Sequence, residues 1–265
     1  MLAAVVGFLL WHNFFGAGGD IPDIAVGPMR VSAFGMLAAL NVLLGIYLIR
    51  RWCEHFGLDW PTVARGLPWI ILVGYLISHI VSVALYFPEE LTDLRVLLDP
   101  RTRISSFGGI FGGGAVAVLY FRRHGLPPWR YCDPLALGFI GGYIFGRAGC
   151  FAIHDHPGRE SDFLLAVNID GVQRHDAGFY EMWLMLVLCL AILVIVRRCR
   201  PPDGFVVTFF ALTYAPVRFL LDFLRVDEIL YLGLTPGQWM AMLFFFTIGP
   251  WGLMRIRTRR RVGTL

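Results

Sequence analysis

Long apolar runs separated by short polar segments recur along the 265 residues of the chain. A helix needs about 20 apolar residues to cross the hydrocarbon core of a bilayer, and seven runs approach that length. The pattern therefore predicts an all-α polytopic integral membrane bundle of about seven transmembrane helices. The runs without a charged residue are Val31 to Leu48, Gly66 to Phe87, Ile104 to Phe121, Met182 to Val196 and Gly237 to Met254, and those with charges are Pro134 to Ile153 and Gly204 to Leu224.

The first 15 residues, MLAAVVGFLLWHNFF, are apolar but too short to predict a span. They lack the basic start and the cleavage site of a signal peptide, so they predict a short or interfacial helix and leave an eighth span open. No linker or repeat divides the chain, which predicts a single integral-membrane domain over residues 1–265. The longest polar stretch, residues 155–177, can form a small extracytoplasmic lobe with a short strand in FLLAVNI.

Composition agrees with a membrane protein, since 57% of the residues are hydrophobic and only 16% are charged. All 23 basic side chains are arginine, and they gather in alternate loops and at the C-terminus, whereas most acidic residues lie in the intervening loops. The positive-inside rule then places the arginine-rich loops and the C-terminus in the cytoplasm. The net charge of +4 predicts anionic membrane lipid as the partner of those loops, and no nucleic acid.

The five cysteines contain no CxxC pair, and most of them lie in or beside apolar runs. We therefore predict no disulfide framework, no zinc site or other metal site, and no cofactor. Two lines of small residues predict close helix packing, and they suggest that the two helices that carry them are neighbours. The lines are Gly108, Gly109, Gly112 and Gly113, then Gly138, Gly142, Gly146 and Cys150.

Charged residues inside apolar runs are the strongest functional signal, because an ion at mid-bilayer costs about 2.5 to 3.5 kcal/mol on insertion scales. Arg147 lies near the end of one run, and Glu181 opens another. Arg218, Asp222 and Arg225 fall at i, i+4 and i+7, which predicts a shared helical face. Structural ion pairs or snorkelling side chains are one interpretation. Together the residues favour a site for a lipid phosphate, which arginine can bind bidentately.

Several segments in one order resemble the bacterial prolipoprotein diacylglyceryl transferases. They are VGPMRVSAFGML, ISSFGGIFGG, GRAGCFAIHDHPGR, RHDAGFYE, YAPVRFLLDFLR and TPGQWMAM. The resemblance covers roughly residue 26 to the C-terminus, and the ordered set is more specific than any one motif. It implies a seven-helix inner-membrane enzyme that moves diacylglyceryl from phosphatidylglycerol to the thiol of a lipobox cysteine in a prolipoprotein.

The resemblance also implies roles for individual residues, with the active site near the outer leaflet. Arg147 and Arg218 would hold the lipid phosphate and stabilise charge as it leaves, Asp222 and Glu181 would orient them, and Asp155 would position the headgroup or peptide. The remaining matches imply substrate-binding positions. They are Gly108, Gly109, Gly149, Gly158, Arg159, His175, Tyr180 and Arg225.

Two departures from the family pattern remove polar groups that could activate the acceptor thiol. Phe34 stands where the family has tyrosine, and Phe107 stands where it has histidine. A free thiol has a pKa near 8.5 and needs a base or a depressing field, which phenylalanine cannot supply. His154 and His156 lie beside the predicted site and are candidates for a relocated base. Simple exposure in a polar loop is the alternative interpretation of both histidines.

Three functions stay open at this stage. The first is a transferase of this family, and the second is a catalytically silent relative that binds anionic phospholipid or a lipoprotein precursor. The third is an anion transporter, against which stand the gathering of charge near one face and the lack of a visible inverted repeat. Retention of both carboxylate positions with the arginines favours the transferase.

Overall fold

The computed structural model describes residues 24–26, 29–99, 103–226 and 228–262. The chain divides into two compact units, and each contains segments from distant parts of the sequence. The first unit comprises Met1–Ile49, Leu137–Arg200 and Leu220–Asp227. The second comprises Arg50–Ala136, Pro201–Phe219 and Glu228–Leu265. The predicted N-terminal helix lies outside the described residues.

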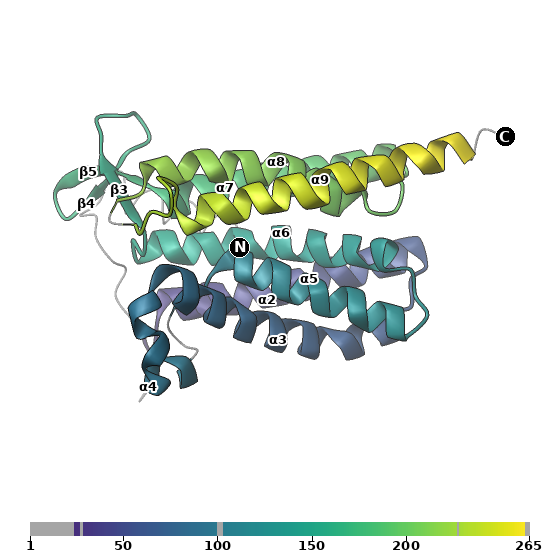
Figure 1. The fold of residues 1–265 in the computed structure, drawn as a ribbon, viewed down its shortest axis with the longest axis horizontal. Coiled ribbons are helices and arrows are strands. Elements are labelled where there is room, and N and C mark those ends of the chain that lie inside the picture. The colour runs from purple at the N-terminus through teal and green to yellow at the C-terminus, as the bar shows by residue number, and fades with distance from the viewer. Residues whose placement is uncertain (1–23, 27–28, 100–102, 227, 263–265) are drawn as a thin grey trace. The chain divides into compact units, whose positions relative to one another are not determined.

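Helices dominate the described residues, as Figure 1 shows. They are α2 (Ala33–Phe56), α3 (Trp60–Tyr86), α4 (Leu94–Leu98), α5 (Ser106–Arg123), α6 (Pro128–Ala152), α7 (Ala177–Arg198), α8 (Phe205–Leu221) and α9 (Pro236–Val262), with short 3₁₀ helices η1 (Pro88–Thr92) and η2 (Asp222–Leu224). Five helical segments are long and apolar enough to cross a membrane, namely α2, α3, α6, α7 and the α8–η2 segment. The predicted all-α membrane fold is therefore confirmed.

The predicted count of seven spans is not confirmed. Helices α5 and α9 form over the two remaining apolar runs, but the described residues give only five segments that meet the requirements of length and hydropathy. Glycine and a terminal arginine pair lower the mean hydropathy of α5, and α9 includes glycine, proline and tryptophan.

In the second unit, α3 and α5 lie side by side (Figure 1). Glycine permits this approach, because a Cβ atom on Gly108 would lie 2.9 Å from the Cα atom of Ser78. A Cβ atom on Gly112 would lie 2.6 Å from the Cβ atom of Ile77. This line of small residues therefore holds α5 against α3, as close helix packing in lipid requires.

In the first unit, the small-residue line of α6 faces α2. A Cβ atom on Gly138 would meet the side chain of Ile49, and one on Gly142 would meet the carbonyl of Asn41. The sequence correctly predicts close packing along both lines. Each line faces its own helix, α3 in one unit and α2 in the other, and the expectation that α5 and α6 are neighbours stays a prediction.

A three-stranded antiparallel sheet precedes α7 in the first unit, with the order β3-β5-β4. Its strands are β3 (Pro157–Glu160), β4 (Val167–Ile169) and β5 (Val172–Asp176), and β5 runs directly into α7 (Figure 1). The turn between β4 and β5 contains Asp170 and Gly171, both with positive φ, of 51° and 85°. Two such residues are typical of a type I′ hairpin.

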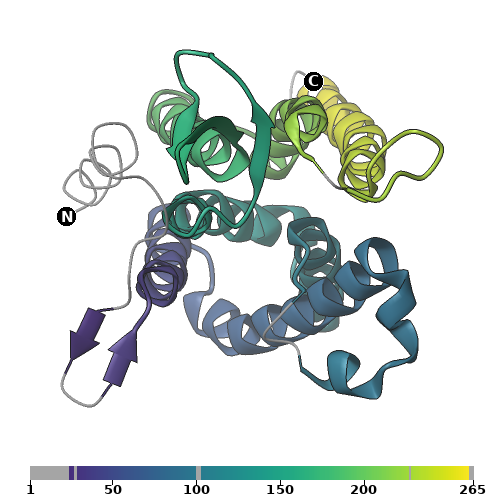
Figure 2. The ribbon, with the colours of Figure 1, turned by 90° about the vertical axis from the view of Figure 1, so that its left-hand side faces the viewer.

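The predicted strand in FLLAVNI forms only over its last three residues, because Ala166 already bonds back to Phe163 in a turn. A separate hairpin pairs β1 (Ile24–Val26) with β2 (Met29–Val31), and it is visible in Figure 2.

Candidate functional site

The first unit contains a buried ion pair between α6 and α7. The Nε atom of Arg147 lies 3.0 Å from Oε2 of Glu181, and the two side chains are 8% and 1% exposed. The guanidinium also lies 4.8 Å from the ring centroid of Tyr143 and donates to the sulfur of Cys150 at 3.7 Å. An ion pair this buried is costly to desolvate unless further contacts compensate for it. The structure thus brings together two charges that the sequence places in separate apolar runs.

The segment after α8 does not continue as an α-helix, so the predicted shared face of Arg218, Asp222 and Arg225 is wrong for the last residue. Helix α8 ends at Leu221, Asp222 begins η2, and Arg225 has extended backbone angles. Backbone pairing of Arg225 with Gly158 accounts for the change.

Asp222 and Arg225 nevertheless remain in contact, with Arg225 Nη1 3.7 Å from the Oδ1 atom of Asp222. Asp222 is buried and lies in the first unit. Arg218 is also buried, and it belongs to the second unit.

The loop after α6 is anchored by His154. Its Nδ1 atom lies 2.9 Å from Oδ2 of Asp176, and both side chains are almost fully buried. The other oxygen of Asp176 accepts from the backbone N–H of Phe179 and caps the start of α7. The backbone of His154 is left-handed, with φ of 45°, which reverses the chain after the helix. His154 therefore ties this loop to the first turn of α7.

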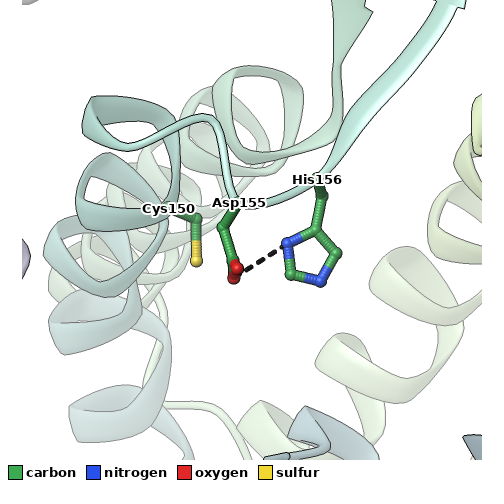
Figure 3. A group of neighbouring side chains, drawn as sticks. All are labelled: Cys150, Asp155 and His156. Atoms are coloured by element: carbon green, nitrogen blue, oxygen red, sulfur yellow. Dashed lines mark ion pairs between the residues drawn. The ribbon is translucent and has the colours of Figure 1, made fainter. Parts of the chain in front are cut away.

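His156 occupies a different environment from His154. Its Nδ1 atom lies 3.0 Å from Oδ2 of Asp155, and both side chains are partly exposed. The backbone N–H of Asp155 donates to the carbonyl of Cys150 at 3.1 Å, which folds the loop back over the end of α6. As a result, Cys150, Asp155 and His156 face one another (Figure 3).

The pKa of the Asp155 carboxyl is held below its usual value, chiefly by the hydrogen bond from His156. The positive charges of Arg147 and Arg225 add to this effect, and together these influences outweigh the opposing effect of burial. Asp155 therefore lies in the field of two arginines that the sequence assigns to the site.

The remaining predicted residues of this unit lie on or beside the sheet. Gly158 is buried, and a Cβ atom there would lie 2.7 Å from the carbonyl oxygen of Leu224, whereas Arg159 is exposed. His175 Nδ1 lies 2.7 Å from the hydroxyl of Tyr180, which also contacts the carbonyl of Leu165. Burial lowers the pKa of His175. These contacts join the sheet to α7.

Phe34 lies against the same end of α6. A Cβ atom on Gly149 would lie 3.0 Å from Cδ2 of Phe34, so glycine is needed where this ring crosses the helix. Gly149, which the resemblance implies as a substrate-binding position, thus has a packing role in the structure.

In the second unit, Phe107 is buried among other aromatic rings. It is 2% exposed, and its ring centroid lies 6.0 Å from that of Tyr214 and 6.3 Å from that of Phe244. Gly108 and Gly109 face α3 near Ser78. Their predicted contact with substrate stays a prediction.

Sequence reasoning missed two members of this arrangement. Asp176 received no role, although an aspartate directly before a predicted helix is a typical N-cap. Cys150 was assigned to helix packing alone, and its spacing to Asp155 and His156 matches no standard metal motif.

Comparison with known proteins identifies the family of the chain. Residues 23–254 match the family model described as prolipoprotein diacylglyceryl transferase. Three relatives are named phosphatidylglycerol–prolipoprotein diacylglyceryl transferase. That of Campylobacter lari is 22% identical over 89% of this chain and 93% of its own, that of Campylobacter jejuni subsp. doylei 28% over 89% and 93%, and that of Agrobacterium fabrum 26% over 89% and 91%. Because the family model spans most of its length, the chain belongs to the prolipoprotein diacylglyceryl transferase family.

Proposed function

We propose that this chain transfers the diacylglyceryl group of phosphatidylglycerol to the thiol of a lipobox cysteine in a prolipoprotein. Family membership supports the reaction class. The observation that carries the proposal is the buried Arg147–Glu181 pair next to a loop that presents Asp155 and His156. A paired arginine in an apolar bundle costs less to bury than an isolated one, and it is preorganised to meet an anion.

In this reaction the acceptor sulfur attacks the glyceryl carbon that bears the phosphate. A C–S bond forms, the C–O bond to the phosphate breaks, and glycerol phosphate leaves with the bonding electrons. Arg147 hydrogen-bonds the phosphate oxygens and stabilises the charge that grows on them. Arg218, which is buried in the second unit, is proposed as a further residue that binds lipid phosphate. Glu181 orients the guanidinium of Arg147, as the 3.0 Å contact allows.

Asp155 and Arg225 are proposed to position the glycerol headgroup or the peptide. Asp222 lies 3.7 Å from Arg225 and orients it, while Gly158 fixes the backbone of Arg225 through the bridge between these two residues. Arg159, His175 and Tyr180 are proposed to line the approach of the substrate from the sheet.

We propose that the protein resides in the inner (plasma) membrane as a single multi-pass domain. The arginine-rich loops and the C-terminus would face the cytoplasm. The α6 end that carries Arg147 would then lie near the outer leaflet, with the three-stranded sheet as an extracytoplasmic lobe.

The direct test is transfer of labelled glyceryl from phosphatidylglycerol to a lipobox peptide by the purified protein in lipid nanodiscs. We expect thioether product, and we expect Arg147→Ala to lower its rate by about 10² to 10³ or more. Arg197→Ala, which removes an exposed arginine at the far end of α7, is the matched control and should retain activity. If saturable, Arg147-dependent phospholipid binding occurs without product, the chain is a silent lipid-binding relative.

A further inference from the structure

Three side chains with metal-ligating atoms converge at the end of α6. The sulfur of Cys150, a carboxylate oxygen of Asp155 and a ring nitrogen of His156 all lie within 4.8 Å of one another. Figure 3 shows the Asp155 carboxylate between the sulfur and the imidazole. Two ligand atoms each about 2 Å from a tetrahedral zinc ion lie roughly 3.3 Å apart. The 3.0 Å separation of Asp155 Oδ2 and His156 Nδ1 is close to that distance between ligand atoms.

The loop that supplies these atoms is fixed from several sides. Asp155 bonds back to the carbonyl of Cys150, and the buried His154–Asp176 contact holds the residue just before Asp155. Directly after His156, Pro157 pairs with Asp176 at the start of β3. All three donors thus come from seven consecutive residues of a braced segment, so that little conformational entropy remains to be lost when a ligand binds.

The donor set indicates the type of ion. One thiolate, one imidazole and one carboxylate suit a borderline-soft divalent cation such as Zn²⁺, whereas Mg²⁺ and Ca²⁺ prefer oxygen ligands alone. Two anionic ligands would neutralise the ion. The nearby Arg147 is already paired with Glu181, and its guanidinium donates to the Cys150 sulfur, an outer contact that would orient a thiolate ligand.

We propose that Cys150, Asp155 and His156 form a site for a zinc-class divalent cation with an open fourth coordination position. The proposal departs from the sequence prediction of no metal site, which rested on the absence of a CxxC pair and on the position of the cysteines in or beside apolar runs. Three protein ligands with one open position are the arrangement of catalytic rather than structural zinc sites.

The use of the open position rests on the proposed function. The acceptor thiol binds the ion there and loses its proton to solvent, because a coordinated thiol is deprotonated. The bound thiolate then attacks the glyceryl carbon and leaves the metal as a thioether, while glycerol phosphate departs. The ion supplies the activation for which Phe34 and Phe107 have no polar group.

The binding test does not depend on transfer activity. Untagged protein in nanodiscs is stripped with a chelator and titrated with Co²⁺, which gives visible d–d bands and a near-ultraviolet sulfur-to-cobalt band when a thiolate coordinates it. We expect about one equivalent of metal per chain and loss of both signals in Cys150→Ala and His156→Ala. Cys199→Ala, which removes an exposed cysteine at the end of α7, is the matched control and should bind like the parent. A cobalt spectrum without the sulfur band, or one that persists in Cys150→Ala, overturns the site.

The role in transfer is tested on the same samples. Chelation should abolish thioether formation and Zn²⁺ should restore it, and Cys150→Ala should lose activity while keeping phosphatidylglycerol binding. Full activity of the stripped protein overturns thiol activation but leaves the proposed transferase standing. Stoichiometric metal binding without transfer in any metal state supports the site and overturns both the thiol-activation role and the proposed transferase function.

Discussion

The end of α6 and the start of α5 contrast in their chemistry. Around Phe107 on α5, where the resemblance implies a histidine in the family, an aromatic ring lies among Tyr214, Phe244 and Phe111. At the end of α6, Cys150 and His156 bring a thiol and an imidazole to the carboxylate of Asp155. The start of α5 is part of the apolar core, whereas the end of α6 carries reactive side chains. The absence of a polar group at Phe107 is therefore compatible with diacylglyceryl transfer, because other side chains can activate the acceptor thiol.

Breaking the buried Arg147–Glu181 ion pair should have the strongest effect. Glu181→Ala leaves the Arg147 charge buried without its carboxylate, which should cost about 3 to 5 kcal/mol of stability. Thermal unfolding in nanodiscs measures it. Glu181→Gln keeps a hydrogen-bond acceptor and should lose less, so equal losses in the two variants would show that the ion pair itself contributes little.

The two histidines of the α6 loop should separate stability from chemistry. His154→Ala removes the partner of the buried Asp176 carboxylate and should cost about 1 to 3 kcal/mol. His156→Ala removes a partly exposed ring and should leave the unfolding midpoint nearly unchanged while transfer falls about a hundredfold. Parallel unfolding and transfer assays on both variants check the split. Active, folded His156→Ala protein would remove this histidine from the mechanism.

A substitution of Phe107, in the aromatic cluster at the start of α5, should have a smaller effect that is limited to stability. Phe107→Leu keeps an apolar side chain in the ring cluster and should cost about 1 kcal/mol or somewhat more. Activity per folded molecule should not change, because the ring has no polar group to contribute. Measured kcat and KM, compared with the unfolding midpoint, test this. A fall in kcat at full stability would place Phe107 in contact with substrate.

The smallest expected effect is a pH dependence from His175. Burial lowers its pKa below the ordinary value of about 6.5, so the unfolded chain binds a proton more readily than the folded chain does. Stability should therefore fall as the pH drops through about 6.5 toward the lower folded value, and change little above it. Unfolding midpoints across this window should flatten in His175→Gln, while an unchanged slope would assign the dependence to another group.

Asp155 acts in the same direction as His175, but in a lower pH window. Its carboxylate is stabilised in the folded protein, so its contribution is complete above the unfolded pKa of about 3.9 and is lost only as the pH falls through the lower folded value. The slope near pH 6 thus reports on His175 and not on Asp155.

Much of the fold followed from the sequence, because hydrophobic runs of membrane length leave few alternatives to helices. Five of the predicted runs form helices that are long and apolar enough to cross a membrane, and the glycine spacing correctly predicted close packing. Which helix faces each glycine line could not be read from spacing, since many helices offer a comparable surface. The end of α8 at Leu221 was also missed, because the backbone contact between Arg225 and Gly158 joins residues far apart in the sequence.

For the candidate site, the sequence identified the charged residues but not their pairing. Arg147 and Glu181 stood out because charge in an apolar run is costly, yet only the fold shows that they meet. The sequence also treated His154 and His156 alike. Their difference arises from the left-handed turn at His154. The ring of His154 points inward to Asp176, and the ring of His156 is partly exposed.

The two-residue turn between β4 and β5 offers a site for a chemical label that reports membrane topology. Asp170 is exposed and lies outside the paired residues of β4 and β5, so a label attached there is directed away from the strand pairing. A thiol introduced at this position in a variant without the exposed Cys199, treated with a reagent that cannot cross a bilayer and compared with the same variant lacking the new thiol, would report from which side of the cell envelope the hairpin is reached.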